Sequence, residues 1–203
     1  MQDGMTYATR TGPGAGGQTR AGAFATVVRG VMAGAIGTWA LDRADWFMWD
    51  RESEQSRQRT RSVRPDGEPP AHVLAGKVER MLDLEASREL HAATGQAIHF
   101  AIGILPAIAY AFVRHRLPGR GVARGLALGG GMFAMQDELM NSVSGLGARP
   151  RDYPWQAHAR GLVAHLVYGV ATELMLNAME TSARRLAGDY ARTPASRAGW
   201  TSD

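Results

Sequence analysis

The feature that most constrains this chain is a run of twenty residues, 94–113, that contains no Asp, Glu, Lys or Arg. Its sequence is TGQAIHFAIGILPAIAYAFV. A helix of about 20 predominantly apolar residues is long enough to cross the hydrocarbon core of a bilayer. Pro106 would kink such a helix, but prolines are tolerated in membrane-spanning helices. The run therefore predicts a transmembrane helix.

Three further segments have the composition of membrane spans. Residues 24–48 are apolar apart from Arg29 and a polar end, where aromatic residues typical of a membrane–water interface gather: Trp46, Phe47 and Trp49. Residues 122–140 include three consecutive glycines, which disfavour a helix in water but allow close helix packing in a bilayer. Residues 159–180 form the last segment. We therefore predict an all-α integral membrane bundle of about four transmembrane helices.

The segment between the first two predicted spans, residues 50–92, is strongly polar. Its first part, 50–70, is charged and ends in two prolines, which predicts a solvated loop. Residues 71–91 then place apolar side chains at helical spacing. This pattern indicates an amphipathic helix that lies at the membrane interface or packs on the bundle. A solvated surface helix is the alternative.

The ends of the chain are predicted to lie outside a membrane domain of residues 23–182. Residues 1–22 are rich in Gly, Thr and Gln and lack the apolar stretch of a signal peptide. Residues 183–203 are basic and then rich in Ser, Thr and Gly. Both compositions predict disordered tails.

Charge and cysteine content exclude several classes of protein. The chain has 23 Lys and Arg against 19 Asp and Glu, but its basic residues do not alternate with aromatic ones. We therefore expect no nucleic-acid partner. The absence of cysteine excludes disulfides, thiolate catalysis and Cys-ligated zinc. A soluble helical protein remains an alternative to the membrane protein.

The short turn between the second and third predicted spans indicates the orientation. It contains four arginines and no acidic residue: Arg114, Arg116, Arg120 and Arg124. Cytoplasmic loops of membrane proteins are enriched in basic residues. Residues 50–92 hold many basic residues too, but these are mixed with acidic ones. We therefore expect the turn and both termini on the cytoplasmic side of a bacterial inner membrane.

Ionisable residues inside the predicted spans form the candidate functional site, because such residues are costly in a membrane. Consecutive spans alternate in direction, so residues from all four spans fall in one layer towards the same face. On the last span, three residues separated by seven and eight positions are expected to form one stripe that runs deeper into the bundle. The candidate residues are Asp42, Asp45, His99, Asp137, Glu138, His158, His165 and Glu173.

This layer has two main interpretations. Histidine titrates near neutral pH and clustered carboxylates raise one another's pKa, so the layer would change charge on acidification and could form the mouth of a proton relay. Alternatively, the side chains form interhelical hydrogen bonds that hold the bundle together, with Asp42 paired to Arg43. The same groups suit zinc or iron, or a b-type haem between His99 and His165. No HExxH spacing is present, so we expect no cofactor, no catalytic residue and no enzyme.

Four segments together resemble the YagU-like family of bacterial inner-membrane proteins. They are RGVMAGAIGTWALDRADWFMW, GQAIHFAIGILPAIAYAF, GMFAMQDELMNSVSGLG and YPWQAHARGLVAHLVYGVATE. The resemblance covers roughly residues 24–180. It implies a multi-pass inner-membrane protein that is associated with tolerance of low pH, and the eight candidate residues are the positions carried over.

The sequence therefore predicts a membrane protein that contributes to tolerance of low pH through protonation of this layer. Two alternatives remain: a structural or accessory subunit of a membrane complex, and a metal- or haem-binding membrane protein. The lipid bilayer is the expected partner. The Gly-rich first and third spans are the surfaces through which a second copy or another membrane protein would bind.

Overall fold

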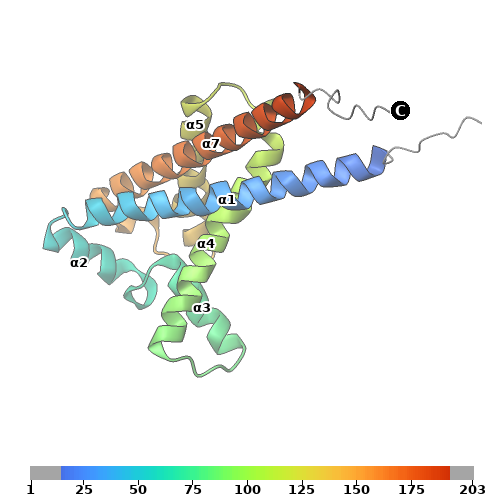
Figure 1. Ribbon diagram of the computed structural model, residues 1–203. Helices are drawn as coiled ribbons and strands as arrows, with labels where there is room; N and C mark the ends of the chain where they lie inside the picture. The colour runs from blue at the N-terminus through green and yellow to red at the C-terminus, as the bar shows by residue number, and fades with distance from the viewer. Residues whose placement is uncertain (1–14, 193–203) are drawn as a thin grey trace, which may run out of the picture.

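The computed structural model describes residues 15–192, with side chains for 20–189, and every regular element in this part of the chain is a helix (Figure 1). The long helices are α1 (Ala15–Trp49), α4 (Arg88–Val113) and α7 (Trp155–Arg192). The shorter elements are α2 (Glu54–Val63), η1 (Pro65–Gly67), α3 (Pro70–Met81), η2 (Arg114–Arg116), α5 (Val122–Met132), the π-helix η3 (Phe133–Met140), α6 (Asn141–Val143) and η4 (Pro150–Asp152). The all-α prediction is confirmed.

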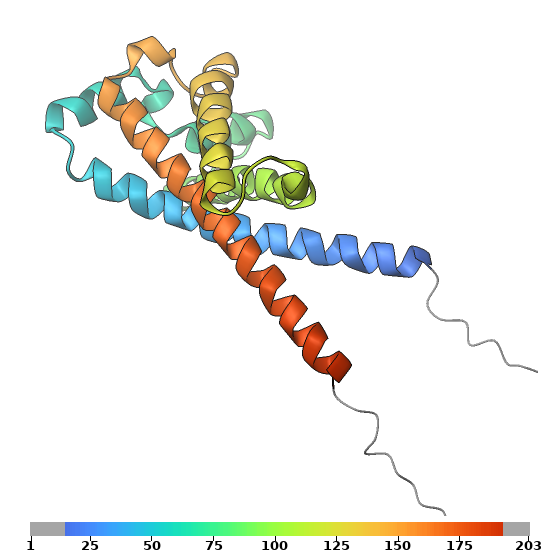
Figure 2. The same ribbon diagram turned by 90° about the horizontal axis from the view of Figure 1, so that it is seen from above.

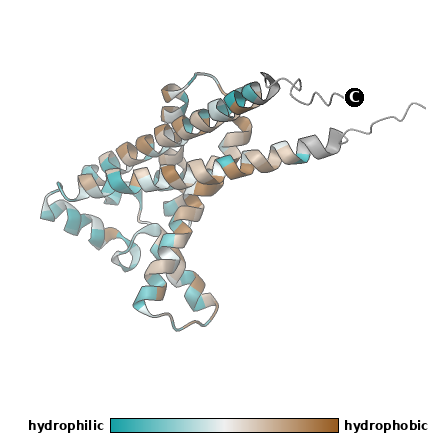
Figure 3. Ribbon diagram, in the orientation of Figure 1, coloured by the Kyte–Doolittle hydropathy of each residue, from teal (hydrophilic) through white to brown (hydrophobic). Residues whose placement is uncertain are grey.

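Three helices are long and apolar enough to cross a membrane. They cover Arg20–Trp49, Arg88–Arg116 and Trp155–Asp189 and confirm three of the four predicted spans by length and composition. Between 17% and 39% of the most apolar window of each helix is buried inside the protein. The remaining apolar surface faces outward, which is the arrangement of a protein embedded in lipid rather than in water. Figure 3 shows the hydrophilic residues concentrated in α2, α3 and the C-terminal part of α7.

The predicted third span, 122–140, is helical throughout but is not one of these three. Helix α5 covers 11 residues of it, and the remaining eight form the π-helix η3. A π-helix is rare and is found mostly as a single turn, frequently at functional sites. Here it carries two of the candidate residues, Asp137 and Glu138.

The main helices pack in the order α4, α1, α7, α5. Figure 1 shows α1 and α7 side by side, and their chain directions are opposite. Glycines allow the helix backbones to touch where α1 packs on α4 and where α7 packs on α5. A Cβ added to Gly30 would lie 2.6 Å from the Cα of Ile108 in α4, and one added to Gly125 would lie 2.7 Å from the Cα of Val170 in α7. Close backbone approach of this kind is a common basis of helix association in membranes.

The predicted solvated loop at 50–70 contains a helix, α2. Ser53 caps its start by accepting a hydrogen bond from the backbone N–H of Ser56 at 3.2 Å. Glu54 then accepts hydrogen bonds from Arg57 and Gln58 one turn later. A capping serine and side-chain pairs at i, i+3 and i, i+4 stabilise a helix. The prediction of a loop rested on the charged composition of the segment and did not consider these pairs.

The predicted helix at 71–91 is wrong in its extent. Helix α3 ends at Met81, and Asp83 adopts a φ of +52°, which is incompatible with a continuing α-helix. Ser87 then caps α4 by accepting from the N–H of Leu90 at 3.2 Å. The chain therefore reverses between α3 and α4, and α3 packs on the start of α4.

The helices also extend into the predicted tails. Residues 15–22 belong to α1 and residues 183–192 belong to α7. Adding a residue to an existing helix costs far less than nucleating a new one, which favours such extensions. The rest of the predicted tails, 1–14 and 193–203, lies outside the described residues.

The three consecutive glycines of α5 provide a matched test of the packing. A Cβ at Gly129 would lie 2.8 Å from the backbone Cα of Leu166, whereas Cβ atoms at Gly130 and Gly131 would meet nothing within 4 Å. We expect Gly129→Ala to lower the free energy of unfolding by about 1–3 kcal/mol through overpacking. Gly130→Ala should leave it unchanged or raise it, because alanine favours the helix.

The measurement is the midpoint of unfolding in a detergent titration of the purified protein. Equal midpoints for Gly129→Ala and Gly130→Ala would show that α5 and α7 do not touch at this glycine.

Candidate functional site

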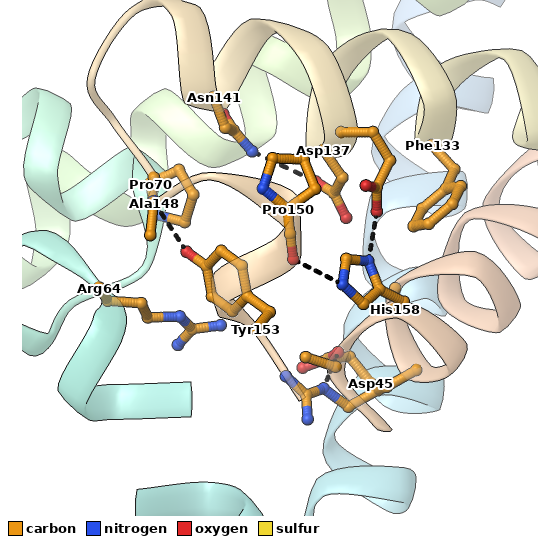
Figure 4. A pocket seen from close by; sticks show the side chains of 15 residues that line it. Asp45, Arg64, Pro70, Phe133, Asp137, Asn141, Ala148, Pro150, Tyr153 and His158 are labelled. Atoms are coloured by element: carbon orange, nitrogen blue, oxygen red, sulfur yellow. Dashed lines mark hydrogen bonds and ion pairs between the residues drawn. The ribbon is translucent and has the colours of Figure 1, made fainter. Parts of the chain in front are cut away.

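A cavity of about 290 Å³ lies where α1, α3, α4, η3 and α7 meet. A second cavity of about 110 Å³ shares part of its wall, including Asp45, Asp137 and Arg160, and is shown in Figure 4. Seven of the eight candidate residues line one or both cavities: Asp42, Asp45, His99, Asp137, Glu138, His158 and His165. The eighth, Glu173, lines neither.

Two candidate histidines bind candidate carboxylates of other helices directly. His99 of α4 lies 2.9 Å from Asp42 of α1, measured from Nε2 to Oδ1. Asp42 is therefore paired with His99, and the pairing with Arg43 that the structural interpretation assumed is absent among the described contacts. His158 of α7 lies 2.6 Å from Glu138 of η3, measured from Nδ1 to Oε1.

Both ring nitrogens of His158 have hydrogen-bond partners. Its Nε2 lies 2.9 Å from the backbone oxygen of Pro150, on the far side of the ring from Glu138 (Figure 4). A carbonyl oxygen can only accept a hydrogen bond, and an ionised carboxylate can only accept one as well. Nε2 therefore donates to Pro150, and the two contacts hold His158 between η3 and η4.

The third pair, His165 and Asp137, is looser. The Nδ1 atom of His165 donates to the backbone oxygen of Gly161 at 2.8 Å, and Asp137 Oδ2 lies 3.6 Å from the same nitrogen. The other oxygen of Asp137 accepts from Asn141 at 3.3 Å. A carbonyl oxygen can only accept, so Nδ1 of His165 carries a proton.

Asp45 is paired with an arginine that the sequence analysis missed. The Nε atom of Arg160 donates to Asp45 at 2.8 Å, and its Nη1 bonds Glu52. Its guanidinium carbon lies 4.6 Å from the centre of the Trp49 ring. Arg160 is only 3% exposed. An arginine at the start of an apolar helix must find an anionic partner. This requirement is the feature of the sequence from which a buried ion pair of Arg160 could have been predicted.

Glu173 lies in a separate buried cluster. It is fully buried and accepts from Arg114 at 3.1 Å, Tyr110 at 2.8 Å and Asn177 at 3.1 Å. The predicted stripe through His165 and Glu173 is therefore wrong. Eight residues advance an α-helix by about 80° beyond two full turns, which rotates Glu173 away from the cavity and towards α4.

Arg114 was expected in a solvated turn, but it is 1% exposed. It also bonds Glu180 at 3.1 Å and Asn177, so its charge is distributed over three acceptors of α7. Its neighbour Arg116 is exposed. A buried arginine is stable only when it is paired, and this one ties the C-terminal end of α4 to α7.

The polar segment 50–92 supplies further wall residues that the sequence analysis did not single out. Arg64 and His72 both line the larger cavity. Burial lowers the pKa of each of them below its ordinary value. The Nδ1 atom of His72 is buried and has no hydrogen-bond partner among the described residues. His72 is therefore held in its neutral form near neutral pH.

The arrangement supports both interpretations of the layer at once. Each pair joins two helices, so it strengthens the bundle, and each of the three His–carboxylate pairs combines two ionisable side chains. Among the described residues, no group of three or more His, Asp or Glu side chains is placed to hold a metal ion.

The buried cluster makes one stability prediction. Arg114→Met should lower the free energy of unfolding by about 3–5 kcal/mol, because it leaves the carboxylate of Glu173 buried without its cation. Arg116→Met, two residues away in an exposed position, should change it by less than about 0.5 kcal/mol. Detergent unfolding of the two purified variants tests the difference, and similar midpoints would contradict the buried pairing.

His72 makes a prediction about pH. Since burial lowers its folded-state pKa below the ordinary value of 6.5, the unfolded chain binds more protons as the pH falls below 6.5. The free energy of unfolding should therefore fall on acidification from pH 6.5. His72→Gln should make this fall shallower. The measurement is the unfolding midpoint between pH 7.5 and 5, and identical slopes for both proteins would refute the assignment.

The site thus consists of two adjoining cavities walled by His–carboxylate and Arg–carboxylate pairs from four separate parts of the chain. No protein-family model, curated protein or solved structure matches this chain.

Proposed function

We propose that this chain is a multi-pass protein of the bacterial inner membrane that contributes to tolerance of low pH. The observation that carries the proposal is the set of three His–carboxylate pairs around two adjoining cavities. In this proposal the continuous helical path of α5, η3 and α6 is a fourth membrane-crossing segment beside the three apolar helices. The resemblance to the YagU-like family supports the same function.

Protonation of the cavity wall would act on contacts between helices. Asp42–His99 joins α1 to α4, and Glu138–His158 joins η3 to α7. When a carboxylate of such a pair takes up a proton, its ion pair with a charged imidazole is lost and a weaker hydrogen bond to a neutral carboxyl group remains. Charging the half-buried His72 in the wall adds a cation whose Nδ1 atom has no partner among the described residues. Acidification would therefore loosen the helices at this end of the bundle.

The proposed orientation places this end at the outer face. With both termini in the cytoplasm, α1 leads outward and α7 leads back, so the cavity lies towards the periplasmic side under α2 and α3. External acid then reaches the wall directly. A change in helix contacts there could open a path for protons or small solutes, or alter contact with a partner.

The accessory-subunit alternative is favoured by one observation. Gly30, Gly34 and Gly37 of α1 already contact helices of the same chain, but Gly130 and Gly131 of α5 have open space beside them. Leu126, one turn earlier, is 44% exposed. This face of α5 could receive a helix of another membrane protein. A stoichiometric partner that co-purifies in mild detergent would favour this alternative.

The test of the proposal is acid survival of a bacterial strain that lacks the gene and carries variants of it. His99→Gln and His165→Gln remove titrating groups of the wall, so survival should fall to the level of the strain without the gene. His115→Gln, whose side chain is 60% exposed and lines neither cavity, is the matched control and should restore survival. All three variants must accumulate in the membrane to equal levels.

Full survival with both His99→Gln and His165→Gln would refute the role of the wall. The orientation is tested separately, because the chain has no native cysteine to interfere. Cysteines at the exposed positions Ser62 and Arg120 are treated in intact cells with a thiol reagent that cannot cross the inner membrane. We expect labelling at position 62 and protection at position 120. The reverse pattern would turn the cavity to the cytoplasm and exclude direct sensing of external pH.

A further inference from the structure

A groove opens at the opposite end of the bundle from the cavity. Figure 2 shows that α1 and α7 diverge there, towards their terminal ends. A space of about 480 Å³ lies between these two helices and the end of α4. Apolar side chains of α4 and α7 line part of it, including Phe112, Leu176 and Ala187. Two arginines on different helices, Arg29 and Arg184, also line it.

The charges in this groove are unbalanced. Glu180 is its single acidic residue, and it is already bound by Arg114 and His115, each at 3.1 Å. Within the described part of the chain, Arg29 and Arg184 make no hydrogen bond or ion pair. Two guanidinium groups therefore face a partly apolar groove without an anion from the protein. The chemistry that fits is an anion attached to an apolar chain.

The depth of Arg29 supports this assignment. Arg29 precedes Trp46 by 17 residues, which is about 26 Å along a helix that rises 1.5 Å per residue. Trp46 and its aromatic neighbours are typical of one membrane–water interface, and the hydrocarbon core is about 30 Å thick. Arg29 therefore reaches the opposite interface, where the lipid phosphates lie. An unpaired arginine inside an apolar helix is costly unless its charge finds such a partner.

We propose that this groove binds an anionic phospholipid. Arg29 and Arg184 hold the headgroup phosphate between α1 and α7, and an acyl chain lies against Phe112 and Leu176. Two unpaired cations favour a lipid of net negative charge over a zwitterionic one, whose own cation would offset the attraction. The bound lipid fills the space between the diverging helices. The proposal is independent of the acid-tolerance function, because it concerns the other end of the bundle.

The experiment measures binding of phosphatidylglycerol to the full chain in detergent by native mass spectrometry, with phosphatidylcholine as the reference lipid. We expect tighter binding of phosphatidylglycerol. Arg29→Gln and Arg184→Gln should each weaken it about fivefold, the effect of one basic residue near a charged membrane surface. Arg59→Gln is the matched control, because Arg59 is exposed on α2 and its loss changes the net charge equally. It should bind as the original protein does.

A second variant separates the groove from surface charge. Ala187→Trp fills the groove without changing any charge and should also weaken phosphatidylglycerol binding. Undiminished binding to Ala187→Trp would show attraction to charge alone and overturn the proposal. Undiminished binding to the Arg29→Gln and Arg184→Gln variants would overturn it as well. Displacement of the lipid by an equal concentration of inorganic phosphate would identify a site for soluble anions instead.

Discussion

Where α1 meets α4 and where α5 meets α7, glycines allow the helix backbones to come into contact. In a bilayer, lipid tails are as apolar as helix surfaces, so burial of apolar area would not drive such helices together. Van der Waals contact and interhelical hydrogen bonds take its place. Gly30 and Gly125 bring the helices close enough for both.

Close packing leaves the polar side chains in two separate places. At one end, His–carboxylate pairs and Arg160 surround the cavity. Further along α7, Arg114 and Glu173 form a fully buried ion pair. A buried charge is tolerable only with a partner, so each cluster contains both signs. The groove at the far end differs from both clusters, because its two arginines have no acidic partner in the described chain.

The pairs that join helices at the two cavities are also the pairs through which we propose that the bundle responds to acid. Asp42–His99, for example, is an interhelical hydrogen bond between α1 and α4. The structural and the functional interpretations of the polar layer therefore do not exclude each other. A bundle whose interhelical bonds depend on protonation changes its packing with pH, whereas a bundle held by backbone contact alone does not.

Much of the candidate site could be predicted from the sequence. Ionisable residues in apolar segments and the alternation of spans were enough to group Asp42, His99 and His158 in one layer, and the structure places them around adjoining cavities. The failures concern rotation and local capping. Glu173 lies about 80° around the helix from the predicted stripe. The helix α2 depends on the cap at Ser53, which a charged composition concealed.

The sequence by itself determined the helical class and the apolar helices, because hydropathy and helix periodicity are local properties of the chain. Only the tertiary structure decided which charges are paired. Arg114 and Arg116 stand two residues apart in the same basic turn, yet one is buried against Glu173 and the other is exposed. The difference arises from the crossing of α4 and α7, which brings together residues about 60 positions apart in the chain, and no local pattern encodes such a contact.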